Sequence, residues 1–208
     1  MLDVLTLQEG KSAVNATATS AHDARLPGWI TAVSLRLDRL VGPVVRRDAT
    51  AALDGGQPRI HLPTHPNTSI TTVTEYDGLR ATVLVAESNL VKPADGYQVD
   101  RYSADPAYLS SVVHRRIGGV DAEFAAGRGN VEFVYVAGRF VDTAGVDERF
   151  KRAGVLMLKN LWRSVQDGTG QVDEFDVPQS IFPTFTVPRS VREMFPGEIQ
   201  DPMPMGDR

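Results

Sequence analysis

The chain of 208 residues contains no cysteine. This absence excludes disulfide scaffolds, thiolate nucleophiles, iron–sulfur clusters and every zinc site that needs a cysteine ligand. The sequence also lacks an apolar run near the roughly 18 residues that a membrane span requires, and it does not open with a basic region followed by an apolar one. We therefore expect a protein that is made in the cytoplasm and has no membrane partner.

An excess of positive charge is missing as well. The sequence has 22 basic and 26 acidic residues and a net charge of −4, so its composition does not favour strong binding to nucleic-acid phosphates. Hydrophobic residues make up 42% of the chain and charged residues 23%, which is an ordinary composition for a globular protein with one sizeable core. Any contact with DNA would have to come from a local group of basic side chains and not from the charge of the whole chain.

Acidic residues, prolines and phenylalanines are concentrated in the last part of the chain, residues 167–208. This part holds eight acidic and three basic residues, six of the thirteen prolines and four of the eight phenylalanines. Proline fixes φ and removes a backbone donor, which predicts an extended segment, and residues 189–195 after Pro188 also fit one or two helical turns. Because solvated linkers are poor in aromatic residues, we interpret the segment as a docking arm. The alternative is that it folds back onto its own domain.

Apolar periodicity predicts three helices in residues 1–166. Thr6 is a candidate N-cap for a short helix over about 5–15. Apolar residues repeat at three and four over about 26–45, where Pro43 should kink or end the helix. A third helix over about 147–165 also has one apolar face, and we expect it to pack against the helix at 26–45.

Between the second and third helices, from about 58 to 137, short β-branched and aromatic runs alternate with turn residues and predict strands. Asp77 and Gly78 provide a hairpin turn, because glycine there can adopt a positive φ. The predicted fold is α+β. It consists of a small helical bundle with an inserted antiparallel β region, followed by an extended Pro/Phe-rich C-terminal arm. The predicted core domain is residues 1–166, and the predicted arm is residues 167–208. The predicted strands are residues 59–62, 69–76, 80–86, 97–102, 112–117 and 131–136.

The sequence gives no positive indication of catalysis, a cofactor or a metal. His61 and His65 have the i, i+4 spacing of helical zinc ligands, but Pro63 and Pro66 make a regular helix there implausible. Residues 127–130 resemble a phosphate loop only briefly, since no Gly-Lys-Ser/Thr follows and the next segment is a predicted strand, so we interpret them as a tight turn. We predict no catalytic, cofactor-binding or metal-binding residues, and expect a protein that is not an enzyme.

Five segments of the sequence, taken in order, carry a resemblance to a known family: 5–11, 40–47, 60–73 with Asp77-Gly78, 130–139 with Tyr-Val-Ala-Gly-Arg, and the helix through Ala153 and Leu161-Trp162. These segments resemble the head-to-tail connector (adaptor) proteins of long-tailed double-stranded DNA bacteriophages, especially those of actinobacterial hosts. The similarity spans residues 1 to about 166, and the long C-terminal segment departs from the short end that is usual in the family.

This resemblance implies a structural protein of the virion neck. It implies a ring, dodecameric in the family, that lies beneath the portal, continues the DNA channel and presents a platform for the stopper or tail-terminator protein. DNA would pass without sequence-specific binding. A closed ring also satisfies head-to-tail interfaces without forming fibres.

For the C-terminal arm we hypothesise contact with the portal protein. Apolar side chains of the arm would enter grooves on the portal while its two arginines meet acidic groups. Two alternatives stay open: a stopper or tail-completion protein of the same neck, and a small soluble α+β enzyme or ligand-binding domain. The candidate portal-binding residues are Phe182, Phe185, Val187, Arg189, Arg192 and Phe195.

Overall fold

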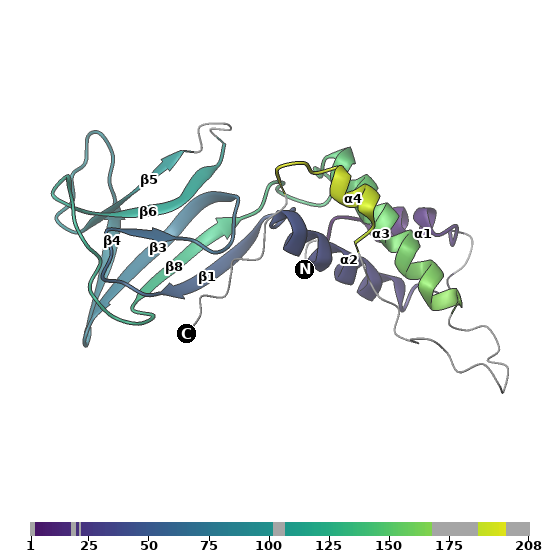
Figure 1. Ribbon diagram of the computed structural model, residues 1–208, viewed down its shortest axis with the longest axis horizontal. Coiled ribbons are helices and arrows are strands. Elements are labelled where there is room, and N and C mark those ends of the chain that lie inside the picture. The colour runs from purple at the N-terminus through teal and green to yellow at the C-terminus, as the bar shows by residue number, and fades with distance from the viewer. Residues whose placement is uncertain (1–2, 18–19, 21, 102–106, 168–186, 199–208) are drawn as a thin grey trace. The chain divides into compact units, whose positions relative to one another are not determined.

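The computed structural model describes residues 3–17, 20, 22–101, 107–167 and 187–198. These residues form two compact units, one helical and one built of strands (Figure 1). The helical unit combines residues up to Val45 with those from Phe140 onward, and the β unit is Arg46–Arg139. The chain is α+β, and the strands are inserted between the second and third helices, as predicted.

The helical unit contains four helices in its described residues: α1 (Leu7–Ala13), α2 (Leu26–Val41), α3 (Glu148–Asp167) and α4 (Arg189–Glu193). The predicted N-cap of α1 is confirmed as a complete capping box. Thr6 Oγ1 accepts from the backbone N–H of Glu9 at 3.2 Å, and Glu9 Oε2 accepts from the backbone N–H of Thr6 at 2.7 Å. These bonds satisfy two backbone donors that the helix itself leaves unpaired.

Helix α2 buries the apolar stripe that its periodicity predicts, and it packs against α3 as expected. It ends at Val41, before the predicted end at 45, because Gly42 turns the chain with φ of 79° and Pro43 cannot donate a helical hydrogen bond. The shared core of the two helices includes Leu26, Ile30, Val33, Leu37, Val41, Phe150, Ala153, Met157 and Leu158.

In its described residues the β unit contains eight strands, of which six match predicted ones. The strands are β1 (Arg47–Leu53), β2 (Arg59–His61), β3 (Asn67–Asp77), β4 (Arg80–Ala86), β5 (Gly96–Arg101), β6 (Leu109–Ile117), β7 (Val120–Asp121) and β8 (Val131–Ala137). The predicted turn between β3 and β4 is confirmed, since Asp77 pairs with Arg80 and Gly78 has φ of 60°.

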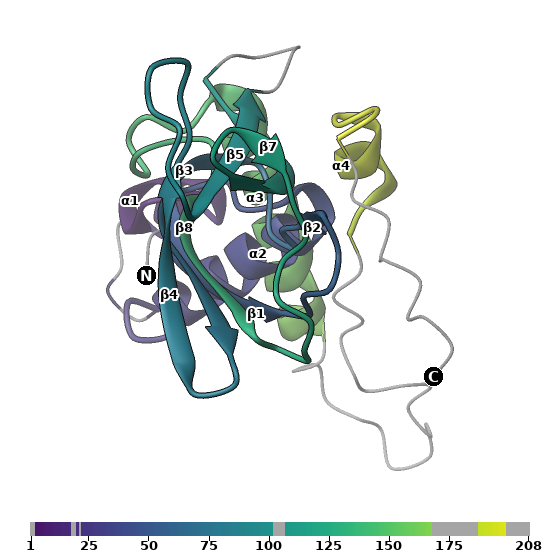
Figure 2. The same cartoon turned by 90° about the vertical axis from the view of Figure 1, so that its left-hand side faces the viewer.

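Strands β3, β4, β5 and β6 pair in a closed circuit, and β8 and then β1 extend the sheet from β3 (Figure 2). The prediction of an antiparallel region was wrong at one place: β4 and β5 are parallel, with Val85 opposite Gly96. The loop of residues 87–95 carries the chain back to the start of β5, and this crossover allows the four strands to close.

Strand β1 was missed because its sequence, Arg-Asp-Ala-Thr-Ala-Ala-Leu, is rich in alanine and charge and has little intrinsic preference for strand. Pairing with β8 along its whole length imposes the conformation. In β8 every second residue is buried, so Val131, Phe133, Tyr135 and Ala137 form a wall of the β-unit core.

Candidate interaction surfaces

The six predicted portal-binding residues are placed in three different ways. Phe182 and Phe185 lie outside the described residues. Val187 and Phe195 are buried in the core of the helical unit, together with Val191 of α4. The side chains of Val187 and Phe195 are therefore covered by their own chain, and among the four candidates that the structure describes only Arg189 and Arg192 are exposed.

Helix α4 is attached to the start of α3 by a compact set of contacts. The rings of Phe150 and Phe195 lie 4.9 Å apart, and the guanidinium of Arg149 lies 5.1 Å from the centre of each ring. Arg149 also forms an ion pair of 2.8 Å with Glu198. Residues 187–198 are thus not part of an extended arm. They follow the alternative that the segment folds back onto its own domain, because Val187, Val191 and Phe195 together bury an apolar face. Helix α4 confirms the helical turns predicted at 189–195.

The outer face of α4 carries the two arginines. Arg189 is 91% exposed in its side chain and donates from Nε to Glu193 at 2.8 Å, an i, i+4 pair that contributes little in water. Arg192, one turn away, is exposed as well. Both cations are accessible to an acidic partner, while the apolar side of the same helix is occupied.

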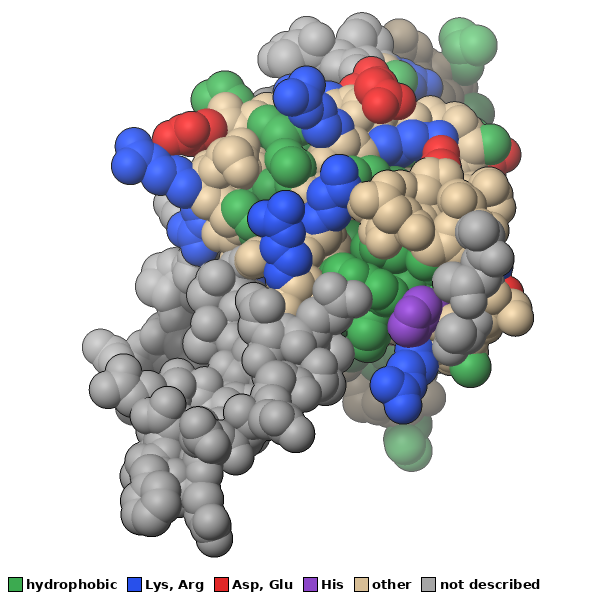
Figure 3. Space-filling model, turned by 90° about the vertical axis from the view of Figure 1, so that its right-hand side faces the viewer, with side chains coloured by type: hydrophobic (Ala, Val, Ile, Leu, Met, Phe, Trp, Pro, Cys, Tyr) green, Lys and Arg blue, Asp and Glu red, His purple; other side chains and the backbone are tan. Residues whose placement is uncertain are grey.

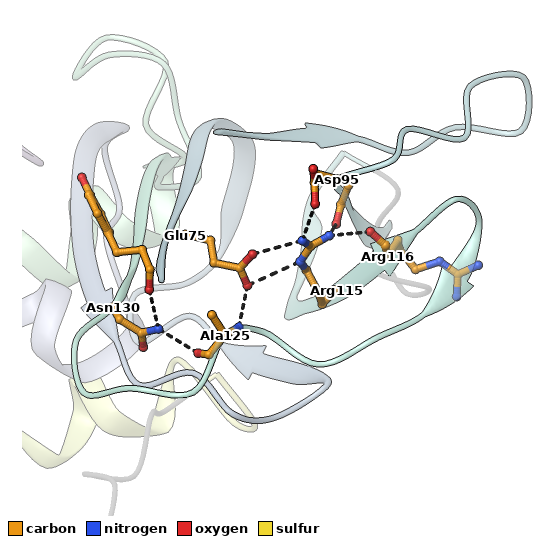
Figure 4. Close-up of polar contacts among 8 residues, drawn as sticks. Glu75, Asp95, Arg115, Arg116, Ala125 and Asn130 are labelled. Atoms are coloured by element: carbon orange, nitrogen blue, oxygen red, sulfur yellow. Dashed lines mark hydrogen bonds and ion pairs between the residues drawn. The ribbon is translucent and has the colours of Figure 1, made fainter. Parts of the chain in front are cut away.

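The β unit contains a buried ionic cluster around Arg115 that the sequence analysis missed (Figure 4). Arg115 Nη2 donates to Glu75 Oε2 at 3.0 Å and to Asp95 Oδ1 at 2.9 Å, and Nη1 donates to the carbonyl of Gly96 at 3.1 Å. Because the side chains of Arg115 and Glu75 are almost fully buried, each compensates the desolvated charge of the other. The alternation of buried residues in β3 and β6 could have indicated inward charges, but not their pairing.

Glu75 and Asn130 connect this cluster to the loop that precedes β8. Glu75 Oε1 accepts from the backbone N–H of Ala125 at 2.7 Å, and Asn130 Nδ2 donates to the carbonyls of Ala125 and Tyr76 at 2.7 and 3.1 Å (Figure 4). Asn130 Oδ1 accepts from the backbone N–H of Gly55 at 3.0 Å. Residues 127–130 are thus a bend in which Asn130 fixes the neighbouring loops by hydrogen bonds within the chain, which agrees with the interpretation as a turn.

One rim of the β unit exposes apolar side chains, which we call the apolar rim: Leu90, Val91, Ile117 and Val120. The backbone N–H of Gly118 donates to the carbonyl of Pro93 at 2.8 Å, which brings the loop of residues 88–93 beside the β6–β7 turn. Exposed apolar side chains that lie together are typical of surfaces that contact other proteins.

Ion pairs between residues adjacent to the apolar rim hold its two segments together. Glu87 accepts from Lys92 and from Arg116 Nε, the latter at 3.1 Å, and Arg116 also pairs with Asp121. The hydrogen bonds from Lys92 and Arg116 lower the pKa of the Glu87 carboxyl, so this group stays ionised below the usual range. The loop and the β6–β7 turn are consequently held together by charge as well as by backbone hydrogen bonds.

No cluster of metal-ligating side chains occurs in the described part of the chain, and no described helix is long and apolar enough to cross a membrane. His61 lies on β2, and His65 lies in the corner before β3. Burial, with the positive charge of Arg139 nearby, lowers the pKa of the His65 imidazole and favours its neutral form.

Comparison with known proteins adds information on the fold. No family model matches the sequence, and no curated protein matches it at a significant level. Among solved structures, the chain is similar to one from the "Neck of empty GTA particle computed with C6 symmetry", with 16% identity and a TM-score of 0.56 over 88% of this chain and 87% of that one. This chain shares its fold with a chain of the GTA neck.

A second similar chain comes from the "Neck of native GTA particle computed with C12 symmetry". The identity is 18% and the TM-score 0.50, with 89% of this chain and 92% of that one covered. Because each of the two units makes up close to half of the sequence, coverage this high includes residues of both. The likeness to the GTA (gene transfer agent) neck therefore concerns the combination of a helical and a β unit.

Proposed function

We propose that this protein is a structural subunit of the neck of a phage-like particle, where it forms a ring beneath the portal and joins the DNA-filled head to the tail. The observation that carries the proposal is the likeness to chains of two GTA necks over 87% and 92% of their length. The ordered similarity of residues 1–166 to connector proteins of long-tailed phages, of the actinobacteriophage type, points to the same place in the particle.

A dodecamer is the ring size that agrees with both neck reconstructions. One was computed with C12 symmetry and the other with C6 symmetry. A twelve-fold ring satisfies both symmetries, because a twelve-fold rotation contains the six-fold one, whereas a six-fold ring does not satisfy the higher symmetry. Head-to-tail contacts between identical subunits close in such a ring and leave no open end.

The described surfaces suit this role. The exposed Arg189 and Arg192 provide cations on the helical unit for an acidic partner, which we propose to be the portal protein. The apolar rim of the β unit provides a surface for a neighbouring copy, or for the stopper or tail-terminator protein. A net charge of only −4 for the chain suits a channel through which DNA slides, because strong phosphate contacts would retard it.

A second candidate is a stopper or tail-completion protein of the same neck, and a ring of six chains would agree with the C6 symmetry of one reconstruction only. Native mass spectrometry of the purified chain, alone and with its portal, distinguishes the two. A connector gives an assembly of twelve chains of 22.7 kDa that binds the portal. An assembly of six chains that does not bind the portal would support the second candidate. A chain that stays monomeric and does not bind the portal would contradict both candidates.

A further inference from the structure

We propose that a groove at the end of the helical unit is a docking site for residues 173–176 of the same chain. These residues read Asp-Glu-Phe-Asp and carry three carboxylates around one aromatic ring. The proposal concerns the way the chain between α3 and α4 is held, and it does not depend on the proposed function.

The groove lies between the end of α1 and the last turns of α3 and has a volume of about 470 Å³. Trp162 forms part of its wall, with its ring edge-on to His22 at 4.8 Å and to Trp29 at 5.4 Å. The remaining lining residues come from the turn after α1 and from α3: Ala13, Val14, Asn15, Ala16, Lys159 and Arg163.

Charge selects an acidic occupant. Lys159 and Arg163 are one turn apart on α3, so both point to the same side of the helix. Neither has an acidic partner within the described residues, although the other cations near α1, Lys11 and Lys151, are paired with Asp23 and Glu9. Figure 3, which looks at this end of the helical unit, shows basic side chains with apolar ones exposed between them.

The aromatic wall suits the residue in the middle of the segment. Phe175 is flanked by Glu174 and Asp176, so a docked segment would bring a phenyl ring to Trp162 while its carboxylates meet the two cations. Edge-to-face aromatic pairs of this kind contribute about 0.5 to 1.5 kcal/mol beyond area burial. Carboxylate pairs with Lys and Arg beside a partly buried ring are also screened less by salt than fully exposed pairs.

The chain is long enough to reach the groove from its own helix. Four residues separate Arg163 from the end of α3, a rise of about 6 Å. Residues 168–172, when extended, span up to about 17 Å, which is more than the chain needs to turn back to Arg163 and Lys159.

The other end of the connecting segment is anchored too, because Val187 and Phe195 are buried in the helical unit. Phe195 contacts Phe150 in the first turn of α3, so roughly 25 Å of helix lies between this anchor and the end of α3. A segment tethered at both ends has an effective concentration on the order of millimolar near its own groove. This favours the same chain over a neighbouring copy as the source of the occupant.

Docking of residues 173–176 would also constrain the part of the segment that holds Phe182 and Phe185. Only residues 177–186 would then remain between two attached points. Such preorganisation lowers the entropic cost of presenting the two phenylalanines to a partner.

The test uses the absence of cysteine and the presence of only two tryptophans in the chain. A Val177→Cys variant of the full chain carries a small fluorophore that tryptophan quenches on contact. We expect quenching at low salt, its loss in Trp162→Phe, and its loss in Lys159→Glu/Arg163→Glu. Arg152→Glu, a reversal of an exposed cation elsewhere on α3, is the matched control and should leave the quenching unchanged. Reversing Asp173 and Glu174 to lysine in the Lys159→Glu/Arg163→Glu background should restore it.

A dilution experiment distinguishes whether the groove is filled by residues 173–176 of the same chain or of a neighbouring copy. The labelled chain is mixed with a large excess of unlabelled Trp29→Phe/Trp162→Phe chain, and circular dichroism confirms that each variant is folded. Quenching that survives the excess supports docking within one chain. Quenching that falls with dilution assigns the segment to a neighbouring copy and overturns the proposal, as does quenching that is absent or insensitive to the charge of Lys159 and Arg163.

Discussion

The ring centres of Phe195 and Phe150 lie 4.9 Å apart, and this contact packs the residues after α4 against the start of α3. Both side chains are almost completely buried, and the guanidinium of Arg149 lies over the two rings. Phe195, three residues before the end of the described chain, is therefore part of the folded core.

Replacing Phe195 by alanine removes this packing. Because a buried phenyl group is lost and a cavity remains, we expect the free energy of unfolding to fall by about 3 kcal/mol. Urea denaturation followed by circular dichroism measures the change. Arg192→Ala, on the exposed side of α4, is the control and should change stability by less than about 0.5 kcal/mol. Equal stability of the two variants would show that α4 does not belong to the core.

The packing of α4 also affects how a portal-binding role must be tested. Ending the chain at Gly168 would remove Val187, Val191 and Phe195 from the core, so lost binding could reflect damage to the helical unit. Phe182→Ser/Phe185→Ser leaves these core residues in place. We expect this double variant to stay folded and to bind the portal at least tenfold more weakly, measured by surface plasmon resonance. Unchanged affinity would exclude the two phenylalanines as portal contacts.

The buried pair of Glu75 and Arg115 should be sensitive to the loss of one partner. Arg115→Met leaves the carboxylate of Glu75 buried without its cation, which costs about 3 to 5 kcal/mol. A second change, Glu75→Leu, removes the stranded charge, and we expect the double variant to recover much of the loss. Urea denaturation of the single and double variants measures both effects. Additive losses would argue that the two side chains do not interact.

The capping box of α1 predicts a dependence on pH. Burial by itself raises the pKa of Glu9, but hydrogen bonds from Lys151 and Thr6 outweigh it and the pKa lies below the ordinary value of 4.5. A carboxyl whose pKa is lowered by folding stabilises the protein above its unfolded pKa, and this contribution is lost as pH falls through the folded value. Thermal unfolding of the wild type and Glu9→Gln should differ most near neutral pH, and the difference should shrink below pH 4.5. A constant difference would show that the charge of Glu9 does not matter.

The elements whose local pattern agrees with their tertiary setting could be predicted from the sequence. The stripe of α2, the capping residue Thr6 and the hairpin at Gly78 are local signals, and each is found where it was expected. Strand β1 and the parallel pairing of β4 with β5 depend on contacts between distant residues, which no local pattern encodes.

The candidate surfaces were harder to predict than the elements. Proline and phenylalanine content set residues 167–208 apart in the sequence and left open that they fold back onto their own domain. It did not show that Val187 and Phe195 would be covered by the core of the helical unit. The groove at Lys159 and Trp162 was missed because its walls come from the end of α1, the turn after α1, and α3. These segments are distant in the sequence and come together only in the folded chain.

The most direct test of a neck function is electron microscopy of lysates from a phage that carries an early stop codon in this gene, with the suppressed mutant as the control. Heads, tails and joined particles are counted on the same grids. Separate tails beside unjoined heads that have packaged or leaked DNA are the predicted result, because the ring that joins head and tail would be missing. Normal joined particles in the absence of the protein would contradict the account.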